Sequence, residues 1–513
     1  MRLSAFASTA LLGSIGAALL LASAPAAFAD DPAKPAAAAD KKDDAKADDK
    51  GDMQAPLPDD KTIQQTVTVG GKVLNYNATV GKITVRDAKG KKIADVVFTA
   101  YIVPGDNPNR PVTFAFNGGP GASSVYLNMG AIGPKHVEFG IDGDAPSDMK
   151  VTDNPNTWLD MTDLVFIDPV GTGFSRSSED ADATKKDFYS TEADIKYLSR
   201  VVYDWLTKNG RMRSPKYVMG ESYGGYRAPR IAYTLQTRMG VGVSGIVMVS
   251  PYLDPAAIGD ETALSPLPWM INLPSMTAGN LERQGKLTPA AMAEVEQYDR
   301  TQFVTDFLAG RSDPQAVGRI VAKVTQYTGL DPALVAKMDG RVDIGTYLRE
   351  AHRSEGKIGS VYDSNVTAYD PFPESYDQQS GDPILNAAIA PTTSAMVDFI
   401  TRQVGWKTDA HYEALSYAVG EAWDRTDEPK DKPVGDLRQA IANDPKMSVL
   451  IAHGYNDLSC PFFTSQLVID QLPAYGGSPK IKLSVYPGGH MFYARPGSSA
   501  SFKADAKAMY SQQ

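Results

Sequence analysis

The sequence predicts an α/β fold with a central, mostly parallel sheet, antiparallel hairpins at its N-terminal side and a mainly helical cap insertion. Alternating β-branched runs between residues 66 and 99, separated by glycine turns, predict the hairpins. Across 112–250, short apolar strands alternate with helical patterns, as in parallel strands joined by helices. Strand signals then give way to helical periodicity and return at 448–452 and 481–486, which indicates one core interrupted by a cap.

These signals divide the chain into five parts. A cleaved signal peptide is expected at 1–29, because Arg2 is followed by an apolar stretch and an Ala27-Phe28-Ala29 cleavage pattern. Residues 30–60 consist mainly of Asp, Lys, Ala and Pro and are expected to form a disordered tether. The other parts are the first part of the core at 61–255, the cap at 256–440 and the second part of the core at 441–513.

Composition narrows the functional classes. The 513 residues carry a formal net charge of −10 without a dense basic cluster, which argues against nucleic acid and anionic membranes as partners. A lone cysteine, Cys460, excludes an intramolecular disulfide, and with the signal peptide it favours a bacterial protein that is periplasmic or secreted. Beyond the apolar stretch of the signal peptide, no membrane span is expected. No His/Cys spacing predicts a metal or cofactor. The sequence does not indicate an oligomeric state.

The chain is organised around a serine motif. A short apolar run beginning at Lys216 leads into Gly220-Glu221-Ser222-Tyr223-Gly224, a G-x-S-x-G pattern. This pattern marks a serine on a sharp turn between a strand and a helix, so Ser222 is the candidate nucleophile. The amide of Tyr223, at the start of that helix, can stabilise negative charge on a bound carbonyl oxygen. Upstream, Thr191 and Asp194 form a capping-box pattern before an apolar helical face.

A serine nucleophile needs a base, and the candidates are His136, His352, His411, His453 and His490. His490 fits best, because it follows the strand expected at 481–486 on a glycine-containing loop, where hydrolases with this motif carry their histidine. His453 is the rival, but its place in an apolar strand indicates a structural histidine. His352 and His411 are expected at the surface of the cap, and His136 has no predicted role.

A carboxylate to orient the base is expected between the serine and the histidine. Asp457 follows the strand at 448–452 and lies between Ser222 and His490 in the chain. A carboxylate there would hold one imidazole tautomer and stabilise the imidazolium. Asp168 also ends a predicted strand, but it precedes the serine.

A glycine-rich loop follows the strand expected at 112–116. Residues 117–124 read Asn-Gly-Gly-Pro-Gly-Ala-Ser-Ser, which is too rich in glycine and proline for a packed element. Such a loop brings backbone amides close to a substrate or to a neighbouring loop.

Together these residues resemble the serine carboxypeptidase family, with blocks in the family's order across about 110–495. The blocks are NGGPGASS at 117–124 with Gly-Pro at 133–134, NPNTW at 154–158, DPVGTGFS at 168–175, GESYGG at 220–225, the Asp457 loop with Cys460, and GGHM at 488–491. The resemblance implies an α/β-hydrolase fold. It also implies removal of C-terminal amino acids from peptide substrates with a free C-terminus.

The resemblance further implies roles for individual residues. These are Ser222, His490 and Asp457 as the triad, Gly119 and Tyr223 as the oxyanion hole, and Asn117, Gly118, Glu221, Cys460 and Met491 as substrate-binding residues. Asn117 and Glu221 would bind the terminal carboxylate, and Cys460 and Met491 would line the subsite of the leaving residue. Because two adjacent carboxylates cannot both stay ionised, such a site favours acidic pH.

Three positions depart from the family's pattern. Ala115 stands where members typically have Trp, and Ala122 stands where they have Cys. Ala131 stands where many members carry a glutamate that partners the Glu221 equivalent. Ala122 is consistent with the absence of disulfides. The departures leave the triad intact but bear on carboxylate recognition and the acidic optimum, so endopeptidase, dipeptidase and esterase activities remain alternatives.

The leading hypothesis is an exported serine carboxypeptidase, and Asn117 with Glu221 favours it. An esterase or acyltransferase would use the same acyl-enzyme on the same fold. A binding protein on an inactive hydrolase scaffold is a third hypothesis, and the presence of all three triad residues argues against it.

Overall fold

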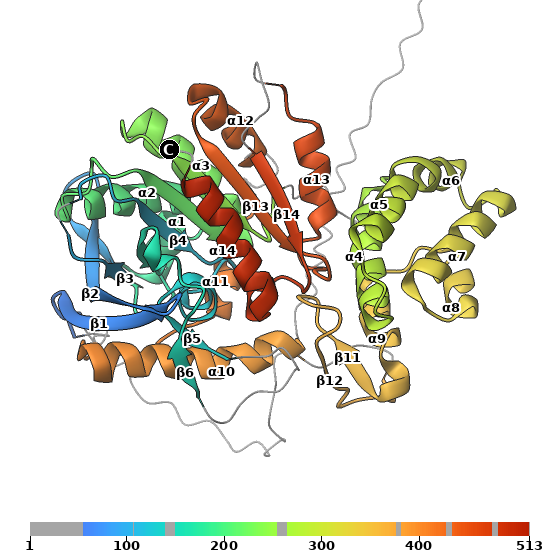
Figure 1. The fold of residues 1–513 in the computed structure, drawn as a ribbon, viewed down its shortest axis with the longest axis horizontal. Helices are drawn as coiled ribbons and strands as arrows, with labels where there is room; N and C mark the ends of the chain where they lie inside the picture. The colour runs from blue at the N-terminus through green and yellow to red at the C-terminus, as the bar shows by residue number, and fades with distance from the viewer. Residues whose placement is uncertain are drawn as a thin grey trace, which may run out of the picture.

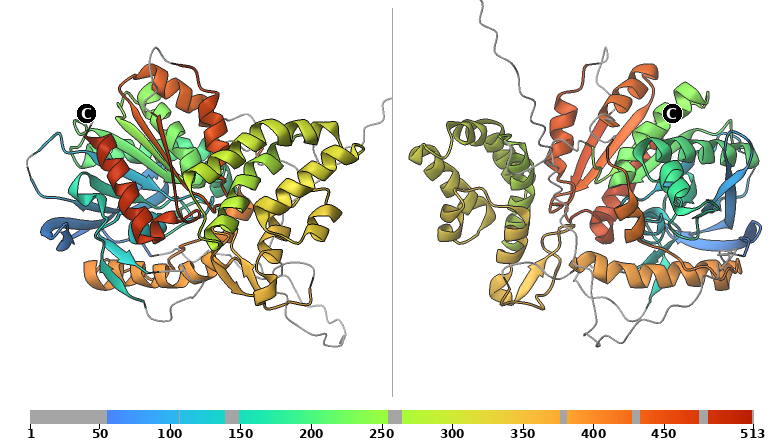
Figure 2. Two further views of the ribbon diagram at one scale, coloured as in Figure 1. Left: turned by 45° about the vertical axis from the view of Figure 1, so that its right-hand side comes forward. Right: turned by 180° about the vertical axis from the view of Figure 1, so that it is seen from behind.

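A computed structural model of the chain describes residues 55–105, 107–138, 149–253, 264–375, 381–426, 433–474 and 481–511. The expected signal peptide at 1–29 and most of the expected tether at 30–60 lie outside these residues. The fold is shown in Figures 1 and 2.

The structure has strands near the positions where the sequence predicts them, together with several strands of two or three residues that it does not predict. They are β1 (Lys61–Val69), β2 (Lys72–Arg86), β3 (Lys92–Ile102), β4 (Val112–Phe116), β5 (Lys135–Val137), β6 (Val151–Asp153), β7 (Asp163–Ile167), β8 (Arg176–Ser177), β9 (Lys216–Glu221), β10 (Gly245–Val249), β11 (Lys357–Gly359), β12 (Thr367–Tyr369), β13 (Ser448–Gly454) and β14 (Ile481–Tyr486).

One 10-stranded sheet forms the centre of the molecule, with the order β1-β2-β3-β7-β4-β9-β10-β13-β14 and β8 beside β3. The first three strands pair antiparallel, and β3 also pairs antiparallel with β7. From β7 to β14 every neighbouring pair is parallel. The predicted hairpins and the predicted parallel sheet are therefore confirmed.

Helices account for most of the remaining structure. The α-helices are α1 (Ala181–Phe188), α2 (Thr191–Lys208), α3 (Tyr223–Arg238), α4 (Leu267–Arg283), α5 (Pro289–Tyr298), α6 (Val304–Ala309), α7 (Pro314–Thr328), α8 (Pro332–Lys337), α9 (Ile344–Glu350), α10 (Pro383–Asp398), α11 (Tyr417–Ala422), α12 (Pro433–Asn443), α13 (Phe462–Asp470) and α14 (Pro496–Tyr510). Shorter helical segments are η1 (Tyr126–Ile132), η2 (Trp158–Asp160), η3 (Asp299–Phe303), η4 (Arg353–Glu355), η5 (Phe399–Val404) and η6 (Phe492–Ala494).

Helices α2, α3 and α12 cover one face of the sheet. Their apolar side chains form one buried cluster with residues of the central strands. Trp205 of α2 lies edge-on to Phe98 and Phe114, with ring centroids 6.3 and 5.3 Å apart. This layer holds α3, the helix that follows Ser222, against the sheet.

Helices α10 and α14 contribute to a second buried cluster on the opposite face. Figure 1 shows α14 lying across the near side of the sheet. The Tyr510 ring of α14 stacks on Tyr217 of β9 with centroids 3.8 Å apart, and its hydroxyl lies 2.6 Å from Thr113 Oγ1 of β4. The sheet is thus enclosed between two layers of helices.

Helices α4–α9 form a separate group beside the sheet (Figures 1 and 2). Their apolar residues between 270 and 348 form a cluster of their own, which Leu458 of the core joins. The helical range expected at 256–440 also contains α10 and α12, which pack on the two faces of the sheet.

The N-cap residue of helix α2 lies one position before the residue expected from the sequence. Ser190 is the capping residue, because its Oγ accepts a hydrogen bond from Ala193 N at 3.3 Å. Thr191 is instead the first helical residue, and its Oγ1 accepts from the hydroxyl of Tyr223 at 3.3 Å. The contact between Thr191 and Tyr223 joins segments that are 32 residues apart, and local sequence does not reveal it.

The tether prediction is wrong at its C-terminal end. Residues 55–60 are described, and Leu57 is buried in the cluster that α10 joins. Lys82 Nζ donates to the carbonyls of Leu57 and Pro58. Arg176 also donates to the carbonyl of Ala55, and Lys208 pairs with Asp60, so apolar burial and several cationic side chains together hold this short segment on the core.

One described stretch, Pro383–Val404, is long and apolar enough to cross a membrane by length and composition. It comprises α10 and η5, and 50% of its apolar window is buried in the fold. Ala388 and Phe399 of this stretch belong to the buried cluster on the sheet. This burial is typical of a core helix in a globular protein.

Candidate active site

Ser222 lies on a sharp turn between β9 and α3. Its backbone has φ +61° and ψ −122°, which is strained for a residue with a side chain. The turn is tight enough that a Cβ on Gly220 would lie 1.8 Å from the carbonyl oxygen of Gly224. The strain is opposed by hydrogen bonds, since Ser222 N donates to Val249 O at 2.9 Å. The predicted strand-to-helix turn is present.

Asp457 and His490 meet at the ends of two neighbouring strands. Asp457 follows β13 and His490 follows β14, and these strands are paired in parallel, so both loops leave the same edge of the sheet. His490 Nδ1 lies 2.8 Å from Asp457 Oδ2, and both side chains are buried. The other carboxylate oxygen, Oδ1, accepts from the amides of Ser459 at 2.8 Å and Cys460 at 2.9 Å.

Electrostatics favour the charged form of this histidine. Burial alone would lower the pKa of His490, but the charge and hydrogen bond of Asp457 raise it, with further help from Glu221 and Asp382. The net pKa of His490 lies above its ordinary value. An imidazole of this kind can accept a proton from a hydroxyl and hold it as imidazolium.

The glycine-rich loop packs against the start of α3. A Cβ on Gly118 would lie 2.5 Å from Tyr223 N, so only glycine permits this approach. Gly119 has φ +102°, and its amide belongs to the same loop. The first amides of a helix have no acceptor within the helix, so Tyr223 N–H is available to a ligand.

A buried ion pair that the sequence did not predict supports this loop. Arg227 Nε donates to Asp194 Oδ2 at 2.6 Å, and Arg227 Nη1 donates to Asn117 O at 2.6 Å. The guanidinium also lies over the ring of Tyr223, 4.9 Å from its centroid. Arg227 follows the serine by five positions on α3, yet nothing in its local sequence distinguishes it from a surface arginine.

Glu221 is enclosed by two donors. Asn117 Nδ2 donates to Glu221 Oε2 at 2.9 Å, as expected for a pair that acts together. The hydroxyl of Tyr493 lies 3.0 and 2.9 Å from the two carboxylate oxygens. Burial raises the pKa of Glu221 to about 7. Tyr493 was not predicted, although it stands only two residues after Met491 in the His490 block.

A cavity of about 280 Å³ brings the predicted residues together. Every predicted site residue except Asp457, which is buried behind His490, lines it. The further lining residues are Ala122, Tyr126, Tyr252, Tyr362, Leu385, Leu415, Arg425 and Ser459. Burial raises the pKa of the Cys460 thiol well above its ordinary value, so this side chain lines the cavity as a neutral group.

The other candidates make different contacts and are not members of the triad. Asp168 Oδ1 accepts from Ser124 N at 2.8 Å and so supports the glycine-rich loop. His453 is buried, with Nε2 2.8 Å from Ser465 Oγ, and His411 is exposed. The expectation that His352 lies at the surface is wrong. It is 3% exposed and its Nε2 lies 2.7 Å from Ser364 O, because the cap folds over it.

His136 is half-buried, and burial lowers its pKa. Within the described residues, no group of three or more His, Cys, Asp or Glu side chains could hold a metal ion.

Comparisons with known proteins relate the chain to enzymes. A serine carboxypeptidase-like protein of Arabidopsis thaliana is 26% identical over 204 residues, which are 39% of this chain and 39% of that protein. A pheromone-processing carboxypeptidase of Ogataea parapolymorpha is 29% identical over 198 residues, which are 37% of this chain and 27% of that protein. The chain thus matches less than half the length of these curated relatives.

Among solved structures, the prohormone-processing carboxypeptidase Kex1(delta)p of Saccharomyces cerevisiae has a similar fold. Its TM-score is 0.55 at 15% sequence identity, covering 85% of this chain and 91% of that one. The family model for serine carboxypeptidases matches residues 74–485. This match covers most of the chain, including the serine turn, the glycine-rich loop and the Asp457 loop, and so the chain belongs to the serine carboxypeptidase family.

Proposed function

We propose that the protein is an exported serine carboxypeptidase that removes C-terminal residues from peptides through an acyl-enzyme on Ser222. The single observation that carries the proposal is the shared cavity. It is lined by Ser222, by the His490 side chain that is bound to Asp457, and by Glu221, which is bound to Asn117. A nucleophile with its base thus faces the same space as a buried acid suited to bind a carboxylate.

In the first half of the reaction, Ser222 Oγ attacks the carbonyl carbon of the last peptide bond. His490 Nε2 takes the hydroxyl proton, and Asp457 stabilises the imidazolium through Nδ1. The carbonyl oxygen becomes an oxyanion that accepts hydrogen bonds from the amides of Gly119 and Tyr223. When the tetrahedral intermediate collapses, the C–N bond breaks and the imidazolium gives its proton to the leaving amine.

In the second half, water replaces the released amino acid. His490 takes a proton from the water, whose oxygen attacks the acyl carbon. Collapse of the second intermediate breaks the ester bond, and the proton returns to Ser222 Oγ. The products are a peptide shortened by one residue and a free amino acid.

Recognition of the C-terminus depends on the protonation of Glu221. A carboxylate ligand beside an ionised glutamate would be repelled, but burial raises the pKa of Glu221 to about 7. Below that pH the neutral carboxyl can donate a hydrogen bond to the substrate carboxylate, and Asn117 orients it. A single acid with this pKa favours binding from acidic pH up to neutrality.

The site of action is proposed from the N-terminal sequence. Arg2, the apolar stretch that follows and the Ala27-Phe28-Ala29 pattern support cleavage after residue 29 and release into the periplasm or the exterior. Mass spectrometry of the protein recovered from a bacterial periplasmic fraction should show an N-terminus at Asp30 or beyond.

The test of the activity compares three substrates. A blocked dipeptide with a free C-terminus, its amide and its methyl ester are incubated from pH 4 to 8 with the wild-type protein and with Ser222→Ala. Release from the free acid by the wild type, with the amide much poorer, is expected. Turnover of the ester alone would overturn the peptidase assignment in favour of an esterase. No turnover of any of the three would favour an inactive scaffold.

A further inference from the structure

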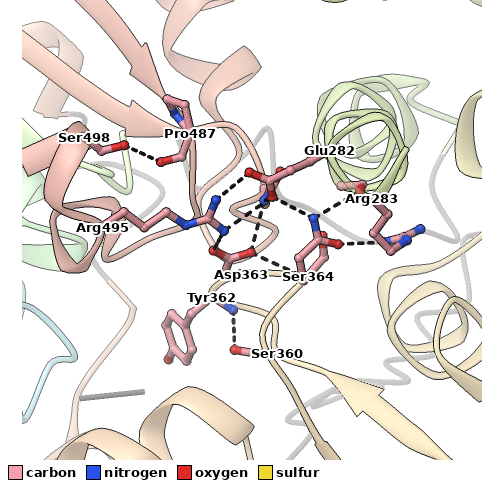
Figure 3. Close-up of polar contacts among 12 residues, drawn as sticks. Glu282, Arg283, Ser360, Tyr362, Asp363, Ser364, Pro487, Arg495 and Ser498 are labelled. Carbon is pink, nitrogen blue, oxygen red and sulfur yellow. Dashed lines mark hydrogen bonds and ion pairs between the residues drawn. The ribbon is translucent and has the colours of Figure 1, made fainter. Parts of the chain in front are cut away.

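An ion cluster lies behind the triad, on the side of the cap. Arg495 immediately precedes α14. Its Nη1 donates a hydrogen bond to Glu282 Oε1, and its Nη2 donates one to Asp363 Oδ2 at 2.7 Å (Figure 3). Glu282 lies at the end of α4 in the cap, and Asp363 lies in the loop between β11 and β12. One guanidinium thus joins three segments that are far apart in the sequence.

The cluster touches the loop that carries Asp457. Asn456 is the residue before Asp457. Its Nδ2 donates hydrogen bonds to Glu282 Oε2 at 2.6 Å and to Asp363 Oδ1 at 3.2 Å. On the other side of Asp457, Leu458 N donates to Val361 O at 3.0 Å. The aspartate is therefore held on both sides by contacts to the cap helix and to the loop 360–366.

The same cluster touches the loop that carries His490. The residue before Asp363 is Tyr362, whose carbonyl accepts from His490 N and whose ring lies edge-on to the imidazole, with centroids 5.2 Å apart. Figure 3 also shows Ser498 Oγ donating to Pro487 O, at 2.7 Å, which fastens α14 to this loop. Gly488 abuts the Arg495 side chain, since a Cβ on it would lie 3.0 Å from Nε.

The charges of the cluster depend on Arg495. The side chain of Asp363 is 6% exposed, and burial raises its pKa while Arg495 opposes the rise. For Glu282, burial would raise the pKa, but the charge and hydrogen bond of Arg495, with the amides of Asn365 and Asn456, outweigh burial and lower it. Without the guanidinium, two neighbouring acids would face one another with only amide donors between them, and they would repel the segments that they hold together.

We propose that Arg495 is a positioning residue. It fastens cap helix α4 and the loop 360–366 to the two loops that carry Asp457 and His490, so that the seating of the cap sets the geometry of the triad. Arg495 is not among the residues that line the cavity. The inference deepens the proposed function and rests on it for the peptide substrate, but not for the reactivity of Ser222.

The test replaces Arg495 with Met, which keeps most of the side-chain volume, and with Lys, which keeps the charge. Arg319→Met is the matched control, because Arg319 pairs with Asp306 inside the cap at 2.6 Å, away from the triad loops. Two readouts are measured, which are kcat and KM for a free-acid peptide and the rate at which diisopropyl fluorophosphate modifies Ser222. The second needs no peptide binding.

Arg495→Met is expected to lower kcat and the modification rate by about 10–100-fold, with KM changed by less than about threefold, because misplacing a triad by a fraction of an ångström costs reactivity rather than binding. Arg495→Lys is expected to restore part of the rate, and the control is expected to retain wild-type rates. A variant with lower thermal stability but wild-type kcat and modification rate would overturn the proposal. So would a change in KM alone.

Glu282→Gln covers the case in which Arg495→Met does not fold. It removes one charge of the cluster while keeping the shape, and it is expected to lower the modification rate by about 3–10-fold. An unchanged rate would count against the proposal. If the wild type is modified at Ser222 but cleaves no peptide, the proposed function fails while the modification rates still decide the role of Arg495.

Discussion

Glu221 is the single acid at a place where many family members are expected to have two glutamates. The position where many family members carry a second glutamate is Ala131, which is buried in η1. The donors that enclose Glu221 are the Asn117 amide and the Tyr493 hydroxyl, and burial raises its pKa to about 7. One acid with a phenol beside it replaces the pair of carboxyls that the resemblance implies.

This arrangement predicts a pH dependence of binding. As pH rises through 7, Glu221 ionises and repels a substrate carboxylate, so KM for a free-acid peptide should rise about fivefold between pH 7 and 8. Glu221→Gln stays neutral, and its KM should be flat over this range. The amide of the same peptide serves as control, because it carries no charge. A wild-type KM that does not change with pH would contradict the role given to Glu221.

Asp457 is expected to control the base. Asp457→Asn removes the charge that raises the pKa of His490 and favours the wrong tautomer, so kcat should fall by about 10⁴-fold. The residual activity should persist to lower pH than that of the wild type, because the pKa of His490 is lower without the charge of Asp457. His411→Gln, at an exposed histidine away from the cavity, should leave kcat unchanged. If kcat of Asp457→Asn decreased by less than tenfold, another group would have to orient His490.

At the scale of elements, the turn at Ser222 depends on two glycines and the strand ends around them. The strained backbone of Ser222 persists because β9, β10 and α3 hold both of its sides, as the bonds to Val249 O and from Gly225 N show. The close approach of Gly220 to Gly224 O leaves no room for a side chain.

Gly220→Ala should therefore destabilise the protein by more than about 3 kcal/mol or prevent folding, because the opposing atoms are backbone and cannot move aside. Gly242→Ala is the control, since a Cβ there would meet nothing within 4 Å. It should change the free energy of unfolding by less than about 1 kcal/mol. The measurement is urea unfolding followed by circular dichroism, and equal midpoints for the two variants would refute the account of the turn.

The positions of most strands in the central sheet could be predicted from sequence because short apolar runs end at loops that contain glycine, as at β4, β9, β13 and β14. Contacts between distant segments could not. Ser190 is the N-cap of α2 while Thr191 contacts Tyr223, and His352 is buried against Ser364, 12 residues away in the chain. These outcomes depend on tertiary neighbours rather than on local pattern.

Some residues of the candidate site can be proposed from local sequence, and others are evident only from three-dimensional contacts. Residues inside a motif, such as Ser222 and His490, can be proposed from sequence because their chemistry requires a fixed place in the chain. Tyr493, Arg227 and Arg495 support these residues from outside the motif positions, and arginines in particular are mostly surface residues. Only the three-dimensional contacts distinguish them.

At the scale of the whole molecule, buried acids make stability depend on pH. Burial raises the pKa of Asp168 to about 7 from an ordinary value of 3.8. Between these values the unfolded chain releases a proton that the folded protein keeps, so this group's contribution to the free energy of unfolding falls as pH rises from about 4 to about 7. Glu221 acts in the same direction.

Asp168→Asn removes this titration while the side-chain oxygen can still accept from Ser124 N. Relative to the wild type, the variant should gain about 2–4 kcal/mol of unfolding free energy between pH 4.5 and pH 8. Urea unfolding at the two pH values measures the difference. A difference that stays constant would show that Asp168 is ionised in the folded protein at both.

The most direct test of the account asks which residue is the nucleophile. The wild-type protein is treated with diisopropyl fluorophosphate, digested and mapped by mass spectrometry, while peptide hydrolysis is followed in parallel. A single adduct on Ser222 is expected, formed in proportion to the loss of activity and absent from Ser222→Ala. An adduct on another residue, or full peptide hydrolysis by protein modified at Ser222, would contradict the account.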